Sequence, residues 1–196
     1  DSINSLGDEV RRFSCEKILL VIGPKIDILP LSRRIKEPLE KVGSEIVVYS
    51  KVVSEPTEDM ANDIVDLVRT GSFDLVIGCG GGSILDMAKI ASVMAKNPGY
   101  IRQYLGSDKI KEKGLPMILV PTTAGTGSEV THSSVVRVDG LKTTVNSDTL
   151  LANVAIVDPS LTLSLPPSIT ASSGCDALSH AIECILSLNA SPITDS

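Results

Sequence analysis

The chain has 196 residues, of which 42% are hydrophobic and 3% are aromatic, with no Trp. Such a composition can bury a substantial core, and it excludes an intrinsically disordered chain. The formal net charge is −6 and no large cluster of Lys and Arg is present, so we expect no nucleic-acid partner. No apolar run approaches the length of a membrane span, and no signal peptide opens the sequence. We therefore expect no membrane partner and a cytoplasmic location.

Apolar runs alternate with helical patterns through the first 120 residues. We expect helices in 1–12, 31–42, 58–69 and 83–96, and strands in 17–22, 45–49, 73–78 and 116–120. The strands are continuous apolar runs, which are typical of parallel strands buried on both faces. The pattern predicts a Rossmann-like, doubly wound, mostly parallel α/β sheet.

The rhythm changes in the second part of the sequence. Segments 135–138 and 142–145 flank Asp139-Gly140, which is a strong hairpin signal. A last strand is expected in 154–157, and only helix, in 171–188, follows it. We therefore predict a dinucleotide-binding α/β domain in 1–160 and the start of an all-helical domain in 161–196. The first residues already look helical and Ser191-Pro192 looks like a new helix start, so we expect a fragment.

The four cysteines are Cys15, Cys79, Cys175 and Cys184, and no two of them have a paired short spacing. Cys79 and Cys184 lie inside apolar segments. We expect these two to be buried free thiols of a cytoplasmic protein rather than disulfide partners or zinc ligands.

The first chemical motif is Gly78-Cys-Gly-Gly-Gly-Ser-Ile-Leu-Asp86, between a strand and a helix. Glycines allow a ligand close to the backbone, and the N-terminus of a helix suits a phosphate. Ser83 and Asp86 have the spacing of a capping box. The motif is not a Walker loop, and Ser83 stands where Gly-x-Gly-x-x-Gly ends. A tight turn without a ligand is the alternative, but four glycines in five residues favour phosphate binding.

The second motif, Pro121-Thr-Thr-Ala-Gly-Thr-Gly-Ser-Glu-Val-Thr131, directly follows the fourth strand. In an open α/β sheet, ligands bind beyond the carboxyl ends of the strands, so this loop is expected beside the glycine turn. Its hydroxyls could bond a pyrophosphate or a ribose. The alternative is a polar connection whose Thr and Ser side chains cap their own backbone.

The third motif is Gly174-Cys-Asp-Ala-Leu-Ser-His-Ala-Ile-Glu183. On a helix, Asp176 and His180 share one face and could grip one divalent cation. Taken alone, a helical Asp–His ion pair is the simpler interpretation. His132 is interpreted as a structural or pocket-lining residue. From its position alone, Lys142 is interpreted as an exposed strand lysine.

These motifs, in this order, resemble those of the iron-dependent alcohol dehydrogenases, also called the group III or iron-activated family. The likeness runs from about residue 17 to the end and rests on Gly80-Gly-Gly-Ser-Ile-Leu-Asp86, Pro121-Thr-Thr-Ala-Gly-Thr-Gly-Ser-Glu-Val-Thr131, Ala155-Ile-Val-Asp-Pro159 and Gly174-Cys-Asp-Ala-Leu-Ser-His-Ala-Ile-Glu183. The resemblance implies an α/β nucleotide-binding domain, a following all-helical domain, and an active site in the cleft between them.

The resemblance also implies a reaction, in which a metal acts as Lewis acid on an alcohol oxygen while a hydride passes to a nicotinamide. It implies Asp176 and His180 as the first two ligands of Fe²⁺ or Zn²⁺, with catalytic residues beyond these ligands unassigned. It places NADP or NAD against a set of residues after the strands: Gly23, Gly81, Gly82, Ser83, Asp86, Thr122, Thr123, Thr126, Thr131 and Lys142. A small alcohol or aldehyde substrate and a homo-oligomer are expected with it.

Two departures from the family pattern stand out. The sequence ends before the two further histidines that normally complete the metal site. NAD-using members often carry an Asp just after the first strand, where this sequence has Gly23, followed by Pro24 and Lys25. Because no acidic group would repel a 2′-phosphate there, we expect NADP(H) to be accepted at least as well as NAD(H).

Three other functions remain open at this stage. One is a glycerol or glycerol-phosphate dehydrogenase, or a metal-free reductase, of the same superfamily, although Asp176 disfavours the metal-free branch. Another is a lyase of the dehydroquinate synthase type, which the Thr-rich loop fits poorly. The last is an inactive nucleotide-binding fragment.

Overall fold

The computed structural model describes residues 1–24, 30–188 and 190–192. Within these residues, five strands form one sheet in the order β2-β1-β3-β5-β8. The strands are β1 (Lys17–Ile22), β2 (Glu45–Tyr49), β3 (Leu75–Gly80), β5 (Met117–Pro121) and β8 (Val154–Ala155). Every neighbouring pair in this sheet is parallel. The predicted doubly wound, Rossmann-like α/β fold is confirmed.

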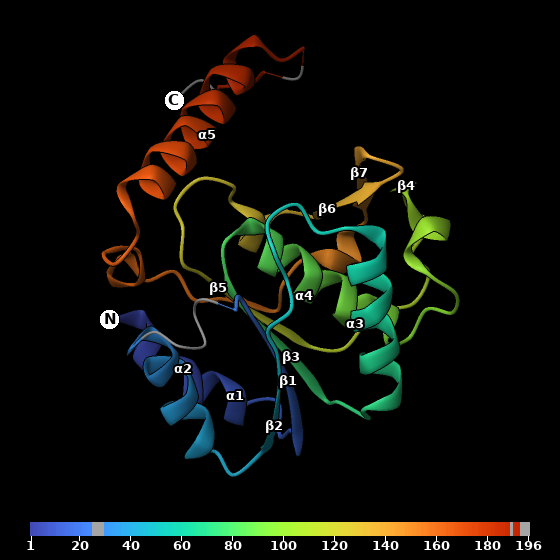
Figure 1. Ribbon diagram of the computed structural model, residues 1–196, viewed down its shortest axis with the longest axis vertical. Coiled ribbons are helices and arrows are strands. Elements are labelled where there is room, and N and C mark those ends of the chain that lie inside the picture. Colours follow the sequence, from blue (N-terminus) through green and yellow to red (C-terminus); the bar gives the residue numbers. More distant parts are fainter. Residues whose placement is uncertain (25–29, 189, 193–196) are drawn as a thin grey trace.

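Helices cover both faces of the sheet (Figure 1). On one face lie the 3-10 helix η1 (Ser2–Ser5), α1 (Leu6–Arg11) and α2 (Pro30–Glu40), and on the other lie α3 (Glu58–Thr70) and α4 (Gly82–Met94). Alternate residues of each central strand enter the two cores: Leu19 packs with the α3–α4 side, and Leu20 with the α1–α2 side. This alternation explains why the strands read as unbroken apolar runs.

Glycine lets α4 lie directly on the sheet. A Cβ at Gly78 in β3 would lie 2.6 Å from the Cβ of Ala88 and 2.9 Å from the Cδ2 of Leu119. A side chain at this position would push the helix off the strand, because packed interiors have no room for extra methyl groups. Gly78 therefore fixes how closely the first turn of α4 approaches the carboxyl end of β3.

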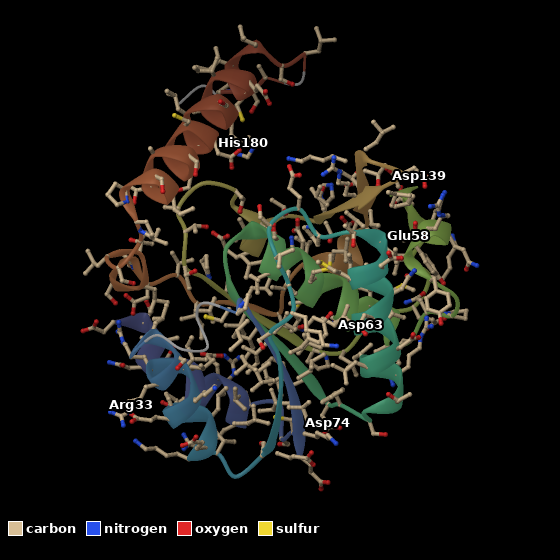
Figure 2. The ribbon with its side chains drawn as sticks, viewed as in Figure 1. Arg33, Glu58, Asp63, Asp74, Asp139 and His180 are labelled. Atoms are coloured by element: carbon tan, nitrogen blue, oxygen red, sulfur yellow. The ribbon has the colours of Figure 1, made fainter. Side chains whose placement is uncertain are left out.

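A second, small sheet joins β4 (Gly106–Ser107), β7 (Leu141–Asn146) and β6 (Ser133–Val138). The predicted hairpin is confirmed: β6 and β7 are antiparallel, and Asp139 and Gly140 have φ values of 51° and 80°. Arg102, in the 3-10 helix η2 (Ile101–Tyr104), donates to both Glu58 on α3 and Asp139 at the hairpin tip. Figure 2 labels these two acceptors. This double ion pair ties the small sheet to the main domain.

Some element boundaries differ from the predicted ones. Strand β3 begins at Leu75 rather than residue 73. Just before it, the carboxylate of Asp74 accepts bonds of 2.9 Å from the backbone N–H groups of Glu16 and Lys17, and the N–H of Asp74 donates to the carbonyl of Lys17 at 2.9 Å. Asp74, labelled in Figure 2, thus caps the start of β1 with its side chain. The short 3-10 helices η3 (Ser128–Val130), η4 (Asp148–Leu150) and η5 (Pro159–Thr162), together with β4, carried no sequence signal that we recognised.

The last helix, α5 (Pro167–Leu186), begins four residues before the predicted 171 and projects away from the sheet (Figure 1). None of its residues is buried. The prediction that Cys184 is buried was therefore wrong, whereas Cys79 in β3 is fully buried. The assignment of α5 to a second domain stays a prediction. The helix start expected after Ser191 falls largely on residues 193–196, outside the described residues.

In the described parts of the chain, no helix combines the length and apolarity that crossing a membrane requires.

Candidate functional site

A cleft opens where the central parallel strands end, between the sheet and α5. It consists of three adjoining cavities of about 860, 510 and 500 Å³. The widest part is lined by Gly23, Val52 and Ile169, and it is mostly apolar. Every residue proposed from the sequence for cofactor or metal lines one or more of these cavities: Gly23, Gly81, Gly82, Ser83, Asp86, Thr122, Thr123, Thr126, Thr131, Lys142, Asp176 and His180.

The glycine turn forms the floor of the cleft. Helix α4 starts at Gly82, with Gly81 as its extended N-cap residue. The first N–H groups of a helix have no acceptor within the helix, and they carry the positive end of its dipole. A Cβ at Gly82 would lie 2.7 Å from the Cγ2 of Thr126, so the turn and the Thr-rich loop touch there. This surface can receive a phosphate against bare backbone.

The capping box predicted for Ser83 and Asp86 was wrong, because the helix has no side-chain cap. The carboxylate of Asp86 is instead turned into the protein. It accepts bonds from the hydroxyl of Ser128 at 2.7 Å and from the backbone N–H of Val135 at 3.1 Å. Burial raises the pKa of Asp86, while these two hydrogen bonds act in the opposite direction. Asp86 lines the cleft, but its bonds show that it joins α4 to the Thr-rich loop and β6.

Lys89, one turn further along α4, was missed by the sequence analysis. It is fully buried, and its ammonium donates to the carbonyl oxygens of Thr131 and Ser133 and to the Thr131 hydroxyl, at 2.9 to 3.0 Å. Burial lowers the pKa of Lys89 to about 8. The available signal was a lone Lys, three residues after Asp86, in an otherwise apolar helix. Such a charge is buried only where acceptors meet it.

The Thr-rich loop continues β5 over the glycine turn. The backbone N–H of Thr122 donates to the carbonyl of Gly80 at 3.0 Å, which extends the β3–β5 pairing. Thr122 is buried, whereas Thr126 is exposed and its hydroxyl accepts from the N–H of Ser128 at 3.2 Å. The loop therefore bonds to its own backbone in part, as expected for a polar connection whose side chains cap the backbone. It also exposes the side chain of Thr126 to the cleft.

Lys142 enters the cleft from the second hairpin strand. Its side chain is 66% exposed, and its ammonium lies 3.0 Å from Oε1 of Glu55. The other carboxylate oxygen of Glu55 lies 3.3 Å from Arg137 on β6. The Lys142 hydrogen bond is the main cause that lowers the pKa of Glu55. The sequence gave no reason to single out Glu55, because it becomes a neighbour of Lys142 only through the tertiary fold.

Asp176 and His180 both face the cleft from α5, and Figure 2 labels His180 on that helix. Oδ1 of Asp176 lies 3.9 Å from Nε2 of His180, and the side chains are 43% and 53% exposed. Two donor atoms on one divalent ion with bonds of about 2.1 Å stand roughly 3.4 Å apart in tetrahedral geometry. The pair therefore fits two ligands of one cation after a small side-chain movement. No group of three or more metal-ligating side chains occurs in the described residues.

Two further sequence predictions concern the edges of the site. Gly23 is buried at the end of β1 and lines the widest cavity, while Lys25 lies outside the described residues. The imidazole of His132 is exposed and does not line the cleft, and its backbone carbonyl accepts from the N–H of Ser147. His132 is thus a structural residue through its main chain alone.

A parallel sheet with a glycine turn and a hydroxyl-rich loop at its carboxyl edge is typical of α/β domains that bind dinucleotides. The sequence model of the iron-containing alcohol dehydrogenases matches residues 1–159. The chain belongs to this family.

Known relatives agree in sequence and in structure. The chain is 46% identical to long-chain-alcohol dehydrogenase 1 of Geobacillus thermodenitrificans, over 99% of this chain and 50% of the relative. It superposes on a crystal structure of 1,3-propanediol oxidoreductase with a TM-score of 0.93 and 31% identity, covering 98% of this chain and 51% of that one. It also superposes on the structure of sulfoacetaldehyde reductase from Bifidobacterium kashiwanohense, which was solved in complex with NAD⁺. That comparison gives a TM-score of 0.86 and 34% identity, and it covers 98% of this chain and 52% of the reductase. The chain spans about half the length of the relatives it matches.

The buried ammonium of Lys89 makes a testable contribution to stability. Replacing it with Met leaves the carbonyls of Thr131 and Ser133 without their donor, and we expect Lys89→Met to lower the free energy of unfolding at pH 7 by about 2–4 kcal/mol. Lys96→Met, which removes an exposed lysine just beyond the same helix, should change it by less than about 0.5 kcal/mol. Urea unfolding followed by circular dichroism measures both.

The depressed pKa of Lys89 also predicts how the stability difference between the parent and Lys89→Met changes with pH. The folded-state pKa of Lys89, about 8, lies below the usual 10.5, so the unfolded chain binds more protons between these values. The stability difference between the parent and Lys89→Met should therefore rise by about 2–3 kcal/mol as the pH rises from about 8 to about 10. A difference that stays flat or falls over this range would contradict the buried, charged Lys89.

Proposed function

We propose that the protein containing this chain transfers a hydride between NAD(P) and a small primary or secondary alcohol or aldehyde, with Fe²⁺ or Zn²⁺ as the Lewis acid. One observation carries the proposal: the phosphate-receiving turn at Gly82 and the Asp176–His180 pair line the same cavity. Family membership and the NAD⁺ bound to the similar sulfoacetaldehyde reductase support it.

In this proposal, each part of the cleft has its own task. The backbone at Gly81, Gly82 and Ser83 receives the pyrophosphate at the start of α4, and the hydroxyls of Thr123 and Thr126 bond it from the opposite wall. The apolar cavity lined by Val52 and Ile169 receives the adenosine end. Lys142 supplies a positive charge beside the phosphates.

The reacting end lies toward α5. Asp176 and His180 hold the cation through a carboxylate oxygen and an imidazole nitrogen, both donors that Fe²⁺ and Zn²⁺ accept. When bound, the nicotinamide takes up the hydride and the cation stabilises negative charge on the alcohol oxygen. Asp86 and Lys89 hold the loops that form the walls, and Asp86 also lines the cavity in which the cofactor is proposed to bind.

The proposal also includes a cytoplasmic location and a homo-oligomeric state. The four cysteines are free thiols, as expected in a reducing compartment such as the cytoplasm. A homo-oligomer is proposed from the family alone.

Dinucleotide binding can be tested at the glycine turn. A Cβ at position 82 would press on Thr126 and occupy the phosphate surface, so Gly82→Ala should weaken NAD⁺ and NADP⁺ binding about tenfold or more. Gly174→Ala, whose Cβ meets no atom within 4 Å, should bind as the parent does. Calorimetric titration of the folded variants measures these affinities, and equal affinities for Gly82→Ala and the parent would refute the phosphate site.

The choice of dinucleotide can be tested at the end of β1. With Gly23 where NAD-using relatives often have Asp, we expect the parent chain to bind NADP⁺ at least as tightly as NAD⁺. Gly23→Asp should weaken NADP⁺ binding at least about fivefold more than NAD⁺ binding, because a carboxylate repels the 2′-phosphate. A strong preference of the parent for NAD⁺ would show that other residues set this specificity.

Metal binding can be tested on the 196-residue chain. Since two ligands hold a cation weakly, Fe²⁺ or Zn²⁺ should be sub-stoichiometric after dialysis, and Asp176→Ala or His180→Ala should abolish the remainder. Metal analysis by mass spectrometry gives the content. Tight, stoichiometric metal that survives both substitutions would place the metal site elsewhere. In the whole protein, His180→Ala should abolish alcohol-dependent formation of NAD(P)H.

A further inference from the structure

The two cavities beside the glycine turn contain one cationic side chain apart from histidine. Among the described residues that line them, Lys142 is the only Lys or Arg, whereas Glu55, Asp86 and Asp176 contribute carboxylates. A dinucleotide brings a doubly negative pyrophosphate to this place under the proposed function. The ammonium of Lys142 is therefore the main mobile charge that can offset it.

The ammonium of Lys142 forms an ion pair with Glu55. Nζ of Lys142 lies 3.0 Å from Oε1 of Glu55, and Glu55 lines the same cavity as Gly82 and Ser83. A pyrophosphate seated on the start of α4 must thus compete with a carboxylate for Lys142. It must also tolerate that carboxylate as a neighbour in the cavity.

Glu55 is held in place independently of Lys142. Its second carboxylate oxygen pairs with Arg137 at 3.3 Å, and Nε of Arg137 donates to the carbonyl of Gly140 at 3.1 Å. The main chain is fixed too, because the carbonyl of Pro56 accepts from the N–H of Arg137 at 2.8 Å. Glu55 itself has a φ of 55°, a conformation that costs a non-glycine residue energy and persists only where its surroundings enforce it.

We propose that Glu55 sets the affinity of the cleft for the anionic dinucleotide by competing with its pyrophosphate for Lys142. The carboxylate neutralises the ammonium until the pyrophosphate displaces it, and this competition weakens binding and favours release of the cofactor. Glu55 is a positioning residue that acts through Lys142 on affinity alone, and the inference rests on the proposed dinucleotide function.

The test removes the charge of Glu55 while keeping its shape. Glu55→Gln should tighten the binding of NAD⁺ and NADP⁺ by the same factor, about two- to fivefold at low ionic strength, because both carry the pyrophosphate. The gain should shrink in about 0.5 M salt, since exposed charges are screened there. Calorimetric titration at both salt concentrations measures it.

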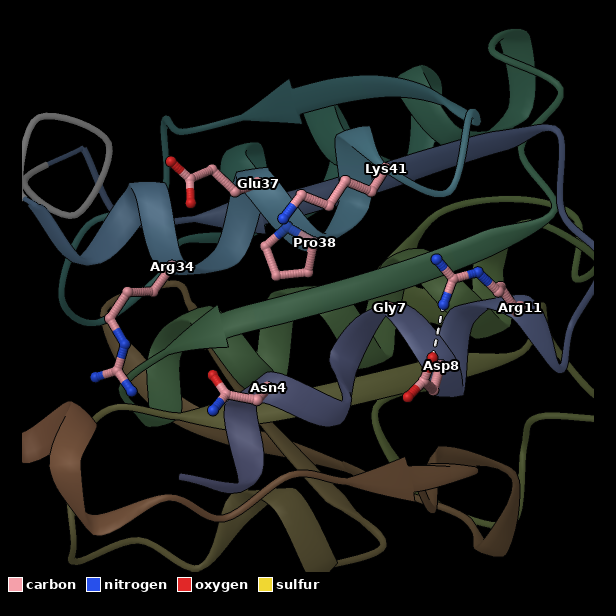
Figure 3. Close-up of a pocket in the computed structure, with 8 residues that line it drawn as sticks. All are labelled: Asn4, Gly7, Asp8, Arg11, Arg34, Glu37, Pro38 and Lys41. Carbon is pink, nitrogen blue, oxygen red and sulfur yellow. Dashed lines mark hydrogen bonds and ion pairs between the residues drawn. The ribbon is translucent and has the colours of Figure 1, made fainter.

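A matched control lies on the opposite face of the sheet. Glu37 on α2 is also an exposed Glu in an ion pair, with Arg33 at 3.2 Å, and it lines a separate groove between α1 and α2 (Figure 3). Glu37→Gln removes the same formal charge and should leave both affinities unchanged. A gain of equal size in Glu37→Gln would show that only the net charge of the protein matters, and it would overturn the proposal.

A double-mutant cycle tests the route through Lys142. In a Lys142→Met background, the gain from Glu55→Gln should fall to less than about half of its value in the parent. A gain that persists in full would mean direct repulsion of the pyrophosphate and would overturn the proposed route. A change in the ratio of NADP⁺ to NAD⁺ affinity would also contradict it.

The binding results distinguish a failure of the Glu55 proposal from a failure of the proposed dinucleotide function. If the folded parent binds neither dinucleotide, the proposed function fails and the inference fails with it. If the parent binds and Glu55→Gln binds equally well, only the inference fails.

Discussion

The close contact between α4 and β3 is the constraint on which the site depends. Gly78 allows Ala88 to lie against the strand, and this contact fixes the height of the helix start above the sheet edge. Gly82 then meets Thr126 of the neighbouring loop. Because β3 and β5 are parallel and adjacent, the helix start and the Thr-rich loop form opposite walls of one cleft. Their spacing follows from glycine packing.

Buried polar groups then hold the walls in position. Asp86 binds Ser128 and Val135, and Lys89 binds Thr131 and Ser133, so one helix face controls both the loop and the start of the hairpin. Burying these charges costs free energy, and only the full set of hydrogen bonds offsets it. The arrangement trades stability for a defined cleft geometry, which the proposed binding of a phosphate through rigid backbone would require.

Helix α5 contributes a carboxylate and an imidazole to the cleft. It brings Asp176 and His180 to the rim opposite the glycine turn, although none of its own residues is buried. The helix comes close to the Thr-rich loop at Gly125, where a Cβ would lie 2.6 Å from the carbonyl of Ser173. Under the proposed function, the start of α4 receives the phosphates and α5 supplies the first two metal ligands, so the two walls of the cleft serve one reaction.

The sequence alone determined the elements whose pattern is local: the parallel strands, the Asp139-Gly140 hairpin and the helix that carries Asp176 and His180. It also indicated the residues that line the cleft, because ligand sites follow the strand ends and motif order placed them there. Tertiary structure decided what depends on distant neighbours. Asp86 has the spacing of a helix cap but turns inward to Ser128 and Val135. The carboxylate of Asp74 caps the start of β1, and Lys89 finds its acceptors more than forty residues away. Cys184 lies in an apolar segment yet is exposed, since burial requires a partner surface that local sequence cannot supply.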